Sequence, residues 1–370
     1  MFNFLKNIII VLFSLFILEL VSQSIILVFG EKKYSFLLKP FSNTLHKNLF
    51  PEEYKINWDY STNKMVPGVY KINLGNKEIT YNINSKGFRG DEFNLKTNKK
   101  RIISFGGSTT IGLESNENQT YPKLLETLLN QDKDEFEVLN FGFGGKSLNY
   151  IKSLFFNEAV DYEPNIITIY SNRNSIMYDG SYVSLTKSEN EKIKKITYFF
   201  QENIMTYRIL SKIIKRFYNY TLEEGYLRSP FSKKGVSEKY LLEDYKNSLE
   251  EIISYSKAKN IQVILIKQAF YINPKISQQI KDISSEKLIE KYKSNYFIKN
   301  YKLSETEQFW LILGTIINKE LDELKNYSNV KIVNPVPELL KNKENFVDFL
   351  HLTPEGNLVL AKEIYKILKL

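Results

Sequence analysis

The chain has 370 residues, of which 43% are apolar and 25% are charged, and its formal net charge is +9. This length suits one large globular domain with additional segments. The absence of cysteine excludes disulfides, a thiol nucleophile and cysteine–zinc sites. The basic charge comes from lysines interspersed with acids, without a long basic run or a nucleic-acid-binding motif, so we expect no nucleic-acid partner.

The N-terminal region departs from this composition. Residues 8–29, IIIVLFSLFILELVSQSIILVF, are numerous and apolar enough to cross a bilayer as a helix. A cleaved signal peptide would need a small-residue site, yet the first alanine of the chain is Ala159. A buried core helix would show a clearer polar face than this segment has. We therefore predict a single-pass transmembrane anchor. Glu19 is an argument against it, because a carboxylate is energetically costly in lipid. The flanking lysines do not decide its orientation.

Residues 31–95 are predicted to form a spacer with a small β element. Val69–Leu74 and Lys77–Ile83 flank Gly75-Asn76, a pattern typical of a β-hairpin. Asn84–Phe93, NSKGFRGDEF, is a glycine-punctuated loop that leads to the first core strand.

Residues 96–370 alternate between strand and helix patterns, which predicts a three-layer α/β/α domain with a mostly parallel sheet. The expected strands are short apolar or β-branched runs, as in a sheet covered on both faces: Arg101–Phe105, Phe136–Phe141, Ile166–Ser171, Ile261–Gln268 and Val330–Asn334. The expected helices are one that starts at Pro122 and three at Glu243–Ala258, Ser304–Tyr327 and Pro354–Leu370. Residues 180–240 interrupt this rhythm as a helical insert rich in Tyr, Lys and Phe, whose role as packed lid, membrane-surface helix or sugar platform is left open.

The segment Arg101–Thr110, RIISFGGSTT, places Ser108 directly after a strand and two glycines. Glycines allow a sharp turn that exposes the hydroxyl at the carboxyl end of the strand, where a nucleophile would stand. The alternative is an ordinary turn in which the serine caps the next helix.

Asp348 and His351 are separated by two residues in VDFLHLTPEGN, near the C-terminus. This spacing lets one loop deliver both side chains to one place, with the carboxylate on one imidazole nitrogen and a hydroxyl on the other. The alternative is a helix-entry loop whose polar residues satisfy backbone groups, which is also our interpretation of the other histidine, His46.

Two further loops follow predicted strands. FEVLNFGFGGKS nearly matches a phosphate-binding loop, but Asn140 stands where the first glycine belongs, and the backbone N–H of Gly145 is the alternative donor to an oxyanion. IITIYSNRNS carries Asn174, whose amide is either a second oxyanion donor or a turn group. These residues, together with Ser108, all follow strand ends, which is the edge where open α/β sheets place their sites.

From about residue 100 onward the chain resembles the SGNH (GDSL-like) hydrolases. FGGSTT resembles their first block, NFGFGGKS the second, YSNRNS the third and DFLHLTPEGN the last. The resemblance implies that Ser108 is the nucleophile, that Asp348 and His351 complete a catalytic triad, and that the N–H groups of Ser108 and Gly145 and the amide of Asn174 form the oxyanion hole.

Two positions depart from the family pattern. Gly107 stands where the family name has Asp, and the third block has Asn172 and Ser175 in place of Gly and an acid. These departures keep open a non-catalytic glycan-binding or scaffold protein.

The resemblance implies an acyl-ester hydrolase, or an O-acyltransferase with the same triad, that needs no metal or cofactor. Its implied substrate is an O-acetylated glycan or a lipid ester. The implied location is a cell membrane, with the catalytic domain on the outer, extracytoplasmic side.

Overall fold

The computed structural model describes residues 13–14, 17–21, 56, 58–59, 64–74, 77–171 and 238–369. The larger of two compact units, Tyr54–Tyr182 with Glu224–Leu370, holds the sheet and all the site residues described below. Most of the predicted anchor, residues 8–29, and most of the predicted insert, residues 180–240, lie outside the described residues. In the described part of the chain, no helix has both the length and the apolar character needed to cross a membrane.

Five parallel strands form the central sheet, in the order β6-β5-β7-β8-β9. Their bounds are β5 Lys100–Gly106, β6 Phe136–Gly142, β7 Ile166–Tyr170, β8 Gln262–Ile266 and β9 Val330–Val333. The five strands predicted from the sequence are confirmed, with ends that shift by one or two residues. The strand order reverses between β5 and β7, and open sheets of this kind place their sites at such a switch point.

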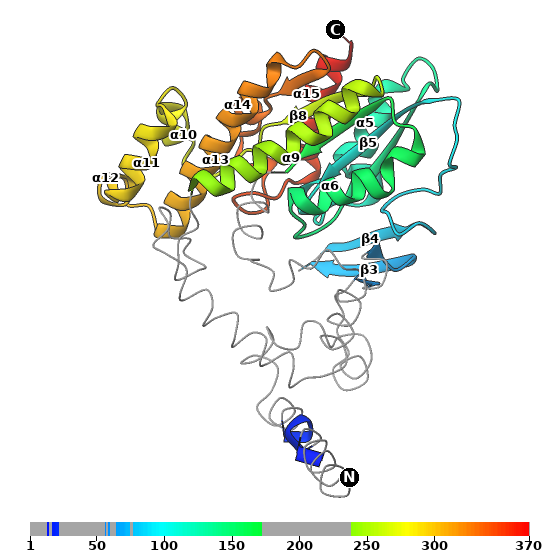
Figure 1. The fold of residues 1–370 in the computed structure, drawn as a ribbon, viewed down its shortest axis with the longest axis horizontal. Helices are drawn as coiled ribbons and strands as arrows, with labels where there is room; N and C mark the ends of the chain where they lie inside the picture. Colours follow the sequence, from blue (N-terminus) through cyan, green and yellow to red (C-terminus); the bar gives the residue numbers. More distant parts are fainter. Residues whose placement is uncertain are drawn as a thin grey trace, which may run out of the picture. The chain divides into compact units, whose positions relative to one another are not determined.

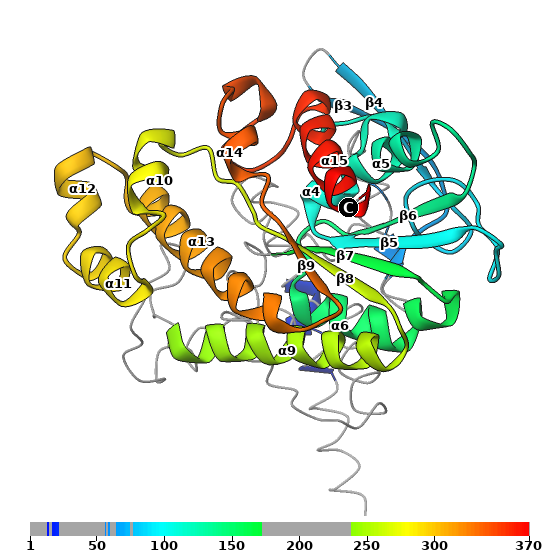
Figure 2. The same cartoon turned by 90° about the horizontal axis from the view of Figure 1, so that it is seen from above.

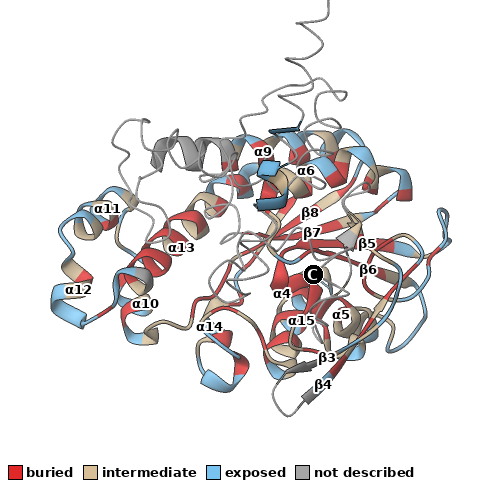
Figure 3. Cartoon of the chain, turned by 90° about the horizontal axis from the view of Figure 1, so that it is seen from below, coloured by how far each residue is buried: buried red, intermediate tan, exposed pale blue. Residues whose placement is uncertain are grey.

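Helices cover both faces of the sheet, so the predicted three-layer arrangement is confirmed (Figures 1 and 2). On one face lie α6, Leu148–Asn157, and α9, Glu238–Ala258. On the other lie α5, Tyr121–Leu129, and α15, Pro354–Lys369. Side chains alternate along each strand, which explains why each face has its own core. In β5, Ile103 and Phe105 pack with α6 and α9, whereas Ile102 packs with α5 and α15. Figure 3 shows the resulting band of buried residues along the strands.

An additional group of helices precedes β9. These are α10 Pro274–Ile280, α11 Ser285–Lys293, α12 Tyr296–Tyr301 and α13 Glu305–Glu323. The first three share a small apolar core with α13, built on Ile276, Leu288, Phe297 and Ile312. We did not predict these three helices, because each is too short for its periodicity to stand out. The predicted end of the helix Ser304–Tyr327 was wrong, since α13 ends at Glu323 and a 3₁₀ turn, Leu324–Asn326, follows.

The segment that precedes β5 is joined to the sheet. Strands β3, Gly68–Leu74, and β4, Lys77–Ile83, form the predicted antiparallel hairpin. A further short pair, β1 Trp58–Asp59 and β2 Lys64–Met65, lies before it. Arg89 bridges both Ile83 and Asn140, so the glycine-punctuated loop runs between the hairpin and edge strand β6. The described part of the predicted spacer therefore contributes to the core of the domain.

Candidate active site

The nucleophile candidate begins a helix of one turn. Gly107 is the N-cap of α4, Ser108–Ile111, and no side chain caps this helix. Ser108 is therefore the first helical residue and not the capping residue that the alternative interpretation required. Its side chain is nearly buried, with 8% of the residue exposed.

Two glycines allow α4 to lie directly on the sheet. A Cβ on Gly106 would collide with the side chain of Thr110 and would lie 2.6 Å from the carbonyl oxygen of Tyr170. A Cβ on Gly142 would collide with the backbone nitrogen of Ile111. The strand ends must therefore lack side chains for Ser108 to reach its observed position.

A closed loop after β9 carries Asp348 and His351. The loop begins beyond α14, Val336–Leu339, and Phe346 forms an antiparallel bridge with Leu352 across its base. The carbonyl oxygen of Asp348's neighbour Phe349 accepts a hydrogen bond from the N–H of Tyr271, at 2.8 Å. This bond attaches the loop to the segment that follows β8. Helix α15 starts directly after the loop.

The structure brings Ser108, His351 and Asp348 together. Ser108 Oγ lies 2.8 Å from His351 Nε2, and His351 Nδ1 lies 2.7 Å from Asp348 Oδ2. The other carboxylate oxygen accepts the backbone N–H groups of Leu350 and His351, each at 2.7 Å. An ionised carboxylate can only accept a hydrogen bond, so Nδ1 of His351 carries the proton and donates it to Asp348, and Nε2 is left without a proton and can accept the one from Ser108.

Asp348 is held in its charged form. Partial burial alone would raise the pKa of Asp348, but the hydrogen bonds from the His351 ring and from the backbone N–H groups of His351 and Leu350 outweigh it and lower this pKa to about 2. The carboxylate therefore stays ionised throughout the neutral range and keeps orienting the imidazole.

Gly145 lies at the same edge of the sheet as Ser108. Strands β5 and β6 are parallel neighbours with Gly106 opposite Gly142, and the N–H of Phe143 donates to the carbonyl oxygen of Gly106 at 3.0 Å. Gly145 has a φ of +73°, which favours glycine. Burial lowers the pKa of the next residue, Lys146, to about 8. Asn174, the third predicted oxyanion donor, lies outside the described residues.

One contact between the two halves of the site was not predicted. Asn357 Nδ2, in the first turns of α15, donates to Ser115 Oγ at 2.9 Å, and both residues are fully or almost fully buried. The bond joins the loop that follows the nucleophile helix to the helix that follows His351. The sequence does show that Asn357 lies on the apolar side of the last predicted helix. Helical periodicity alone, however, cannot identify a serine far away in the chain as its partner.

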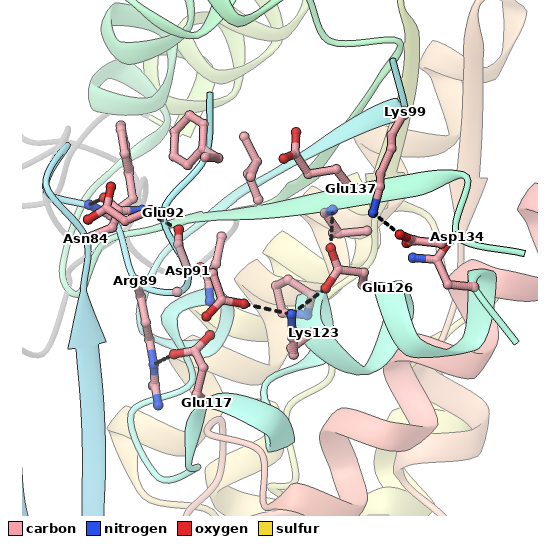
Figure 4. A pocket seen from close by; sticks show the side chains of 18 residues that line it. Asn84, Arg89, Asp91, Glu92, Lys99, Glu117, Lys123, Glu126, Asp134 and Glu137 are labelled. Carbon is pink, nitrogen blue, oxygen red and sulfur yellow. Dashed lines mark hydrogen bonds and ion pairs between the residues drawn. The ribbon is translucent and has the colours of Figure 1, made fainter. Parts of the chain in front are cut away.

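Two clefts, of about 340 and 370 Å³, lie elsewhere on the described part of the chain. The first follows edge strand β6 and α5 (Figure 4), and the second lies between α10, α13 and α14. No residue of the Ser108–His351–Asp348 set lines either cleft.

No model of a known protein family and no curated protein matches this sequence. Solved structures do match it. An acetyl xylan esterase is 14% identical, with 72% of this chain and 98% of that chain covered and a TM-score of 0.41. The acetylxylan esterase Axe2 from Geobacillus stearothermophilus is 14% identical, with 72% and 93% covered and a TM-score of 0.39. A GDSL-like lipase from Bacteroides thetaiotaomicron is 12% identical, with 73% and 88% covered and a TM-score of 0.39.

At these identities the likeness concerns the fold alone. The chain is similar to the SGNH (GDSL-like) hydrolases.

Proposed function

We propose that the protein is a serine ester hydrolase with Ser108 as nucleophile. The observation that carries this proposal is the continuous line of contacts from Ser108 Oγ through the His351 ring to Asp348, at 2.8 and 2.7 Å. A serine hydroxyl is a weak nucleophile unless a base accepts its proton, and this geometry supplies an oriented base.

The proposed reaction has two steps. Ser108 Oγ attacks the ester carbonyl carbon while its proton passes to His351 Nε2, and the carbonyl oxygen becomes an oxyanion. The C–O bond to the alcohol then breaks, the alcohol oxygen takes the proton from Nε2, and an acyl-serine forms. Water then attacks the acyl carbon while its proton passes to His351 Nε2; the bond from that carbon to Ser108 Oγ breaks, Oγ takes the proton from Nε2, and the carboxylic acid is released.

The proposed oxyanion donors are the backbone N–H groups of Ser108 and Gly145 and the side-chain amide of Asn174. The first N–H groups of a helix have no acceptor within the helix, and Ser108 opens α4. Donors aimed at a developing oxyanion are among the largest contributors to acyl-transfer catalysis.

We propose an O-acetyl ester on a glycan as the substrate, with a lipid ester as the alternative, on the basis of the family resemblance. Residues 8–29 would hold the protein in the membrane, with the catalytic domain on the outer side.

Transfer of the acyl group to a sugar hydroxyl would use the same triad, and product analysis separates it from hydrolysis. Free acetate identifies the hydrolase, whereas a newly acetylated sugar identifies the transferase.

A fluorophosphonate probe tests the proposal without knowledge of the substrate. The probe phosphonylates activated serines, so we expect covalent labelling of the purified wild type and none of Ser108→Ala. Ser104→Ala is a suitable control, because Ser104 is a buried serine within the same strand–helix unit, on β5. An unlabelled wild type that is folded would refute the esterase and favour the non-catalytic binding protein.

A further inference from the structure

Arg89, in the glycine-punctuated loop Asn84–Phe93, is a charged residue in the interior of the domain. It is only 1% exposed. A buried charge is unfavourable unless it is paired and hydrogen-bonded, so the partners of this side chain indicate what its burial accomplishes.

The guanidinium group donates to three backbone carbonyls just beyond the nucleophile. Nη1 lies 2.7 Å from the carbonyl oxygens of both Ile111 and Gly112, and Nη2 lies 2.6 Å from that of Ser115. Nε donates to the carboxylate of Glu117 at 3.0 Å, and Figure 4 shows the two side chains pointing toward one another.

One face of the guanidinium group packs on an aromatic ring. It lies 3.9 Å from the ring centroid of Tyr81 on β4, and the Tyr81 hydroxyl donates to the carbonyl oxygen of Leu113. The hairpin and the glycine-punctuated loop thus converge on the turn that ends α4.

The carbonyls of Ile111 and Gly112 stand at the end of α4, a helix too short to be stable by itself, and that of Ser115 lies a few residues beyond it. The last carbonyls of a helix lack partners within it, and a cation there is favourable. The N–H groups of Gly112 and Leu113 donate back to the carbonyl oxygen of Ser108, at 3.1 and 3.3 Å. The Ile111–Gly112 and Gly112–Leu113 peptide units therefore each bind Arg89 through their carbonyl oxygen and the backbone of Ser108 through their N–H group.

We propose that Arg89 is a positioning residue for the nucleophile. Its fork of donors holds the carbonyl end of α4 and so keeps Ser108 Oγ within hydrogen-bond distance of His351 Nε2. Arg89 binds the carbonyl of Ser115, and the hydroxyl of the same serine accepts a hydrogen bond from the side-chain amide of Asn357. This second bond extends the connection to the helix after His351. This inference rests on the proposed esterase function.

The proposal requires the shape of arginine as well as its charge. A planar guanidinium presents several donors at fixed angles, and here it reaches the three carbonyls beyond Ser108, the more distant carbonyl of Thr80 at 3.4 Å and a carboxylate at once. A lysine ammonium is a compact charge on a flexible stem, so Arg89→Lys keeps the charge but loses most of this geometry.

Arg101 offers a matched control at the opposite end of β5. It is also 1% exposed, and it donates to the carbonyl oxygens of Asn94, Leu95 and Tyr162 and pairs with Glu137 at 2.6 Å. Arg101→Lys therefore perturbs an equally buried arginine of the same kind, but at the strand end remote from Ser108.

The experiment compares Arg89→Lys and Arg101→Lys in the full chain. The readouts are the rate constant of fluorophosphonate labelling, kcat and KM for p-nitrophenyl acetate, and the free energy of unfolding. We expect Arg89→Lys to lower the labelling rate and kcat by about 10- to 100-fold, with KM within about threefold, since a misplaced nucleophile affects chemistry more than binding. Arg101→Lys is expected to keep labelling within about threefold despite a similar loss of stability. Equal labelling of the two variants, or a loss confined to KM, would overturn the proposal.

A second variant covers the case in which Arg89→Lys does not fold. Glu117→Gln removes the charge that fixes Nε of Arg89 and so loosens the hold of its guanidinium group on the carbonyls, and we expect a smaller fall in kcat, about three- to tenfold, with KM unchanged. An unchanged kcat would overturn the positioning role. Failure of wild-type labelling would refute the esterase, whereas a labelled wild type with an unaffected Arg89→Lys would refute this inference alone.

Discussion

At the scale of single residues, His351 has the most demanding position, because one imidazole must contact a serine and a carboxylate from distant parts of the chain. Its ring bridges Ser108 Oγ and Asp348 Oδ2, and the Ser108–His351 pair is 243 residues apart in sequence. Each side chain has a separate part in the proposed mechanism, so each makes a separate prediction.

Ser108→Ala and His351→Ala are each expected to lower the turnover of p-nitrophenyl acetate by about 10³-fold or more, because the first removes the nucleophile and the second removes its base. Initial rates with purified, folded variants measure the effect. His46→Ala, which changes the only other histidine of the chain, is the control and should keep full activity. Full activity of either folded triad variant would exclude the proposed mechanism.

Asp348 predicts a pH dependence of stability. Its pKa is about 2 in the folded protein, below the ordinary value of 3.8, so the folded state binds this proton less readily than the unfolded state does. The resulting stabilisation is present above about pH 4 and is lost as the pH falls toward 2. Urea unfolding of the wild type and Asp348→Asn should therefore differ most above pH 4 and converge between pH 4 and 2. A difference that stays constant down to pH 2 would contradict the role of the carboxylate.

At the scale of elements, the position of the nucleophile helix α4 depends on the absence of side chains at Gly106 and Gly142, the last residues of β5 and β6. Gly142 is the last residue of β6 and Gly144 lies two residues later, in the loop that follows, but their surroundings differ. A Cβ on Gly142 would collide with the backbone of α4, whereas a Cβ on Gly144 would meet nothing within 4 Å.

Gly142→Ala is therefore expected to destabilise the fold by about 1–3 kcal/mol and to reduce esterase activity strongly, because the helix that carries Ser108 must move away from the sheet. Gly144→Ala is the matched control and should change the free energy of unfolding by less than about 0.5 kcal/mol. Denaturant unfolding and p-nitrophenyl acetate turnover of the two variants measure both effects. Equal behaviour of the two variants would show that the close packing of α4 is not required.

At the scale of the whole molecule, membrane attachment remains a prediction from the apolar run at residues 8–29. We expect the full-length protein to stay with membranes after high-salt and carbonate washes, and a version without residues 1–30 to be released. N-terminal sequencing completes the measurement. A mature protein that begins near residue 30 would identify a signal peptide instead.

Much of this molecule follows from local sequence. Strands such as Ile166–Tyr170 are apolar runs bounded by turn residues, so their positions can be predicted from hydrophobic pattern alone. The candidate site residues could also be identified from the sequence. Ser108 directly follows a predicted strand and two glycines, and Asp348 and His351 share one short loop before a predicted helix. In contrast, α10, α11 and α12 are short, and their shared core with α13 forms only when the chain is folded.

The tertiary structure alone decided how these parts meet. The sequence determined that Asp348 and His351 share one loop, but the contact with Ser108 requires the parallel order β6-β5-β7-β8-β9 to bring distant loops to one edge. The sequence also determined that Arg89 lies in the glycine-punctuated loop. No feature of the neighbouring sequence, however, distinguishes this arginine from an exposed one. The burial of Arg89 and its bonds to the end of α4 arise from packing between segments more than 20 residues apart, which no local pattern encodes.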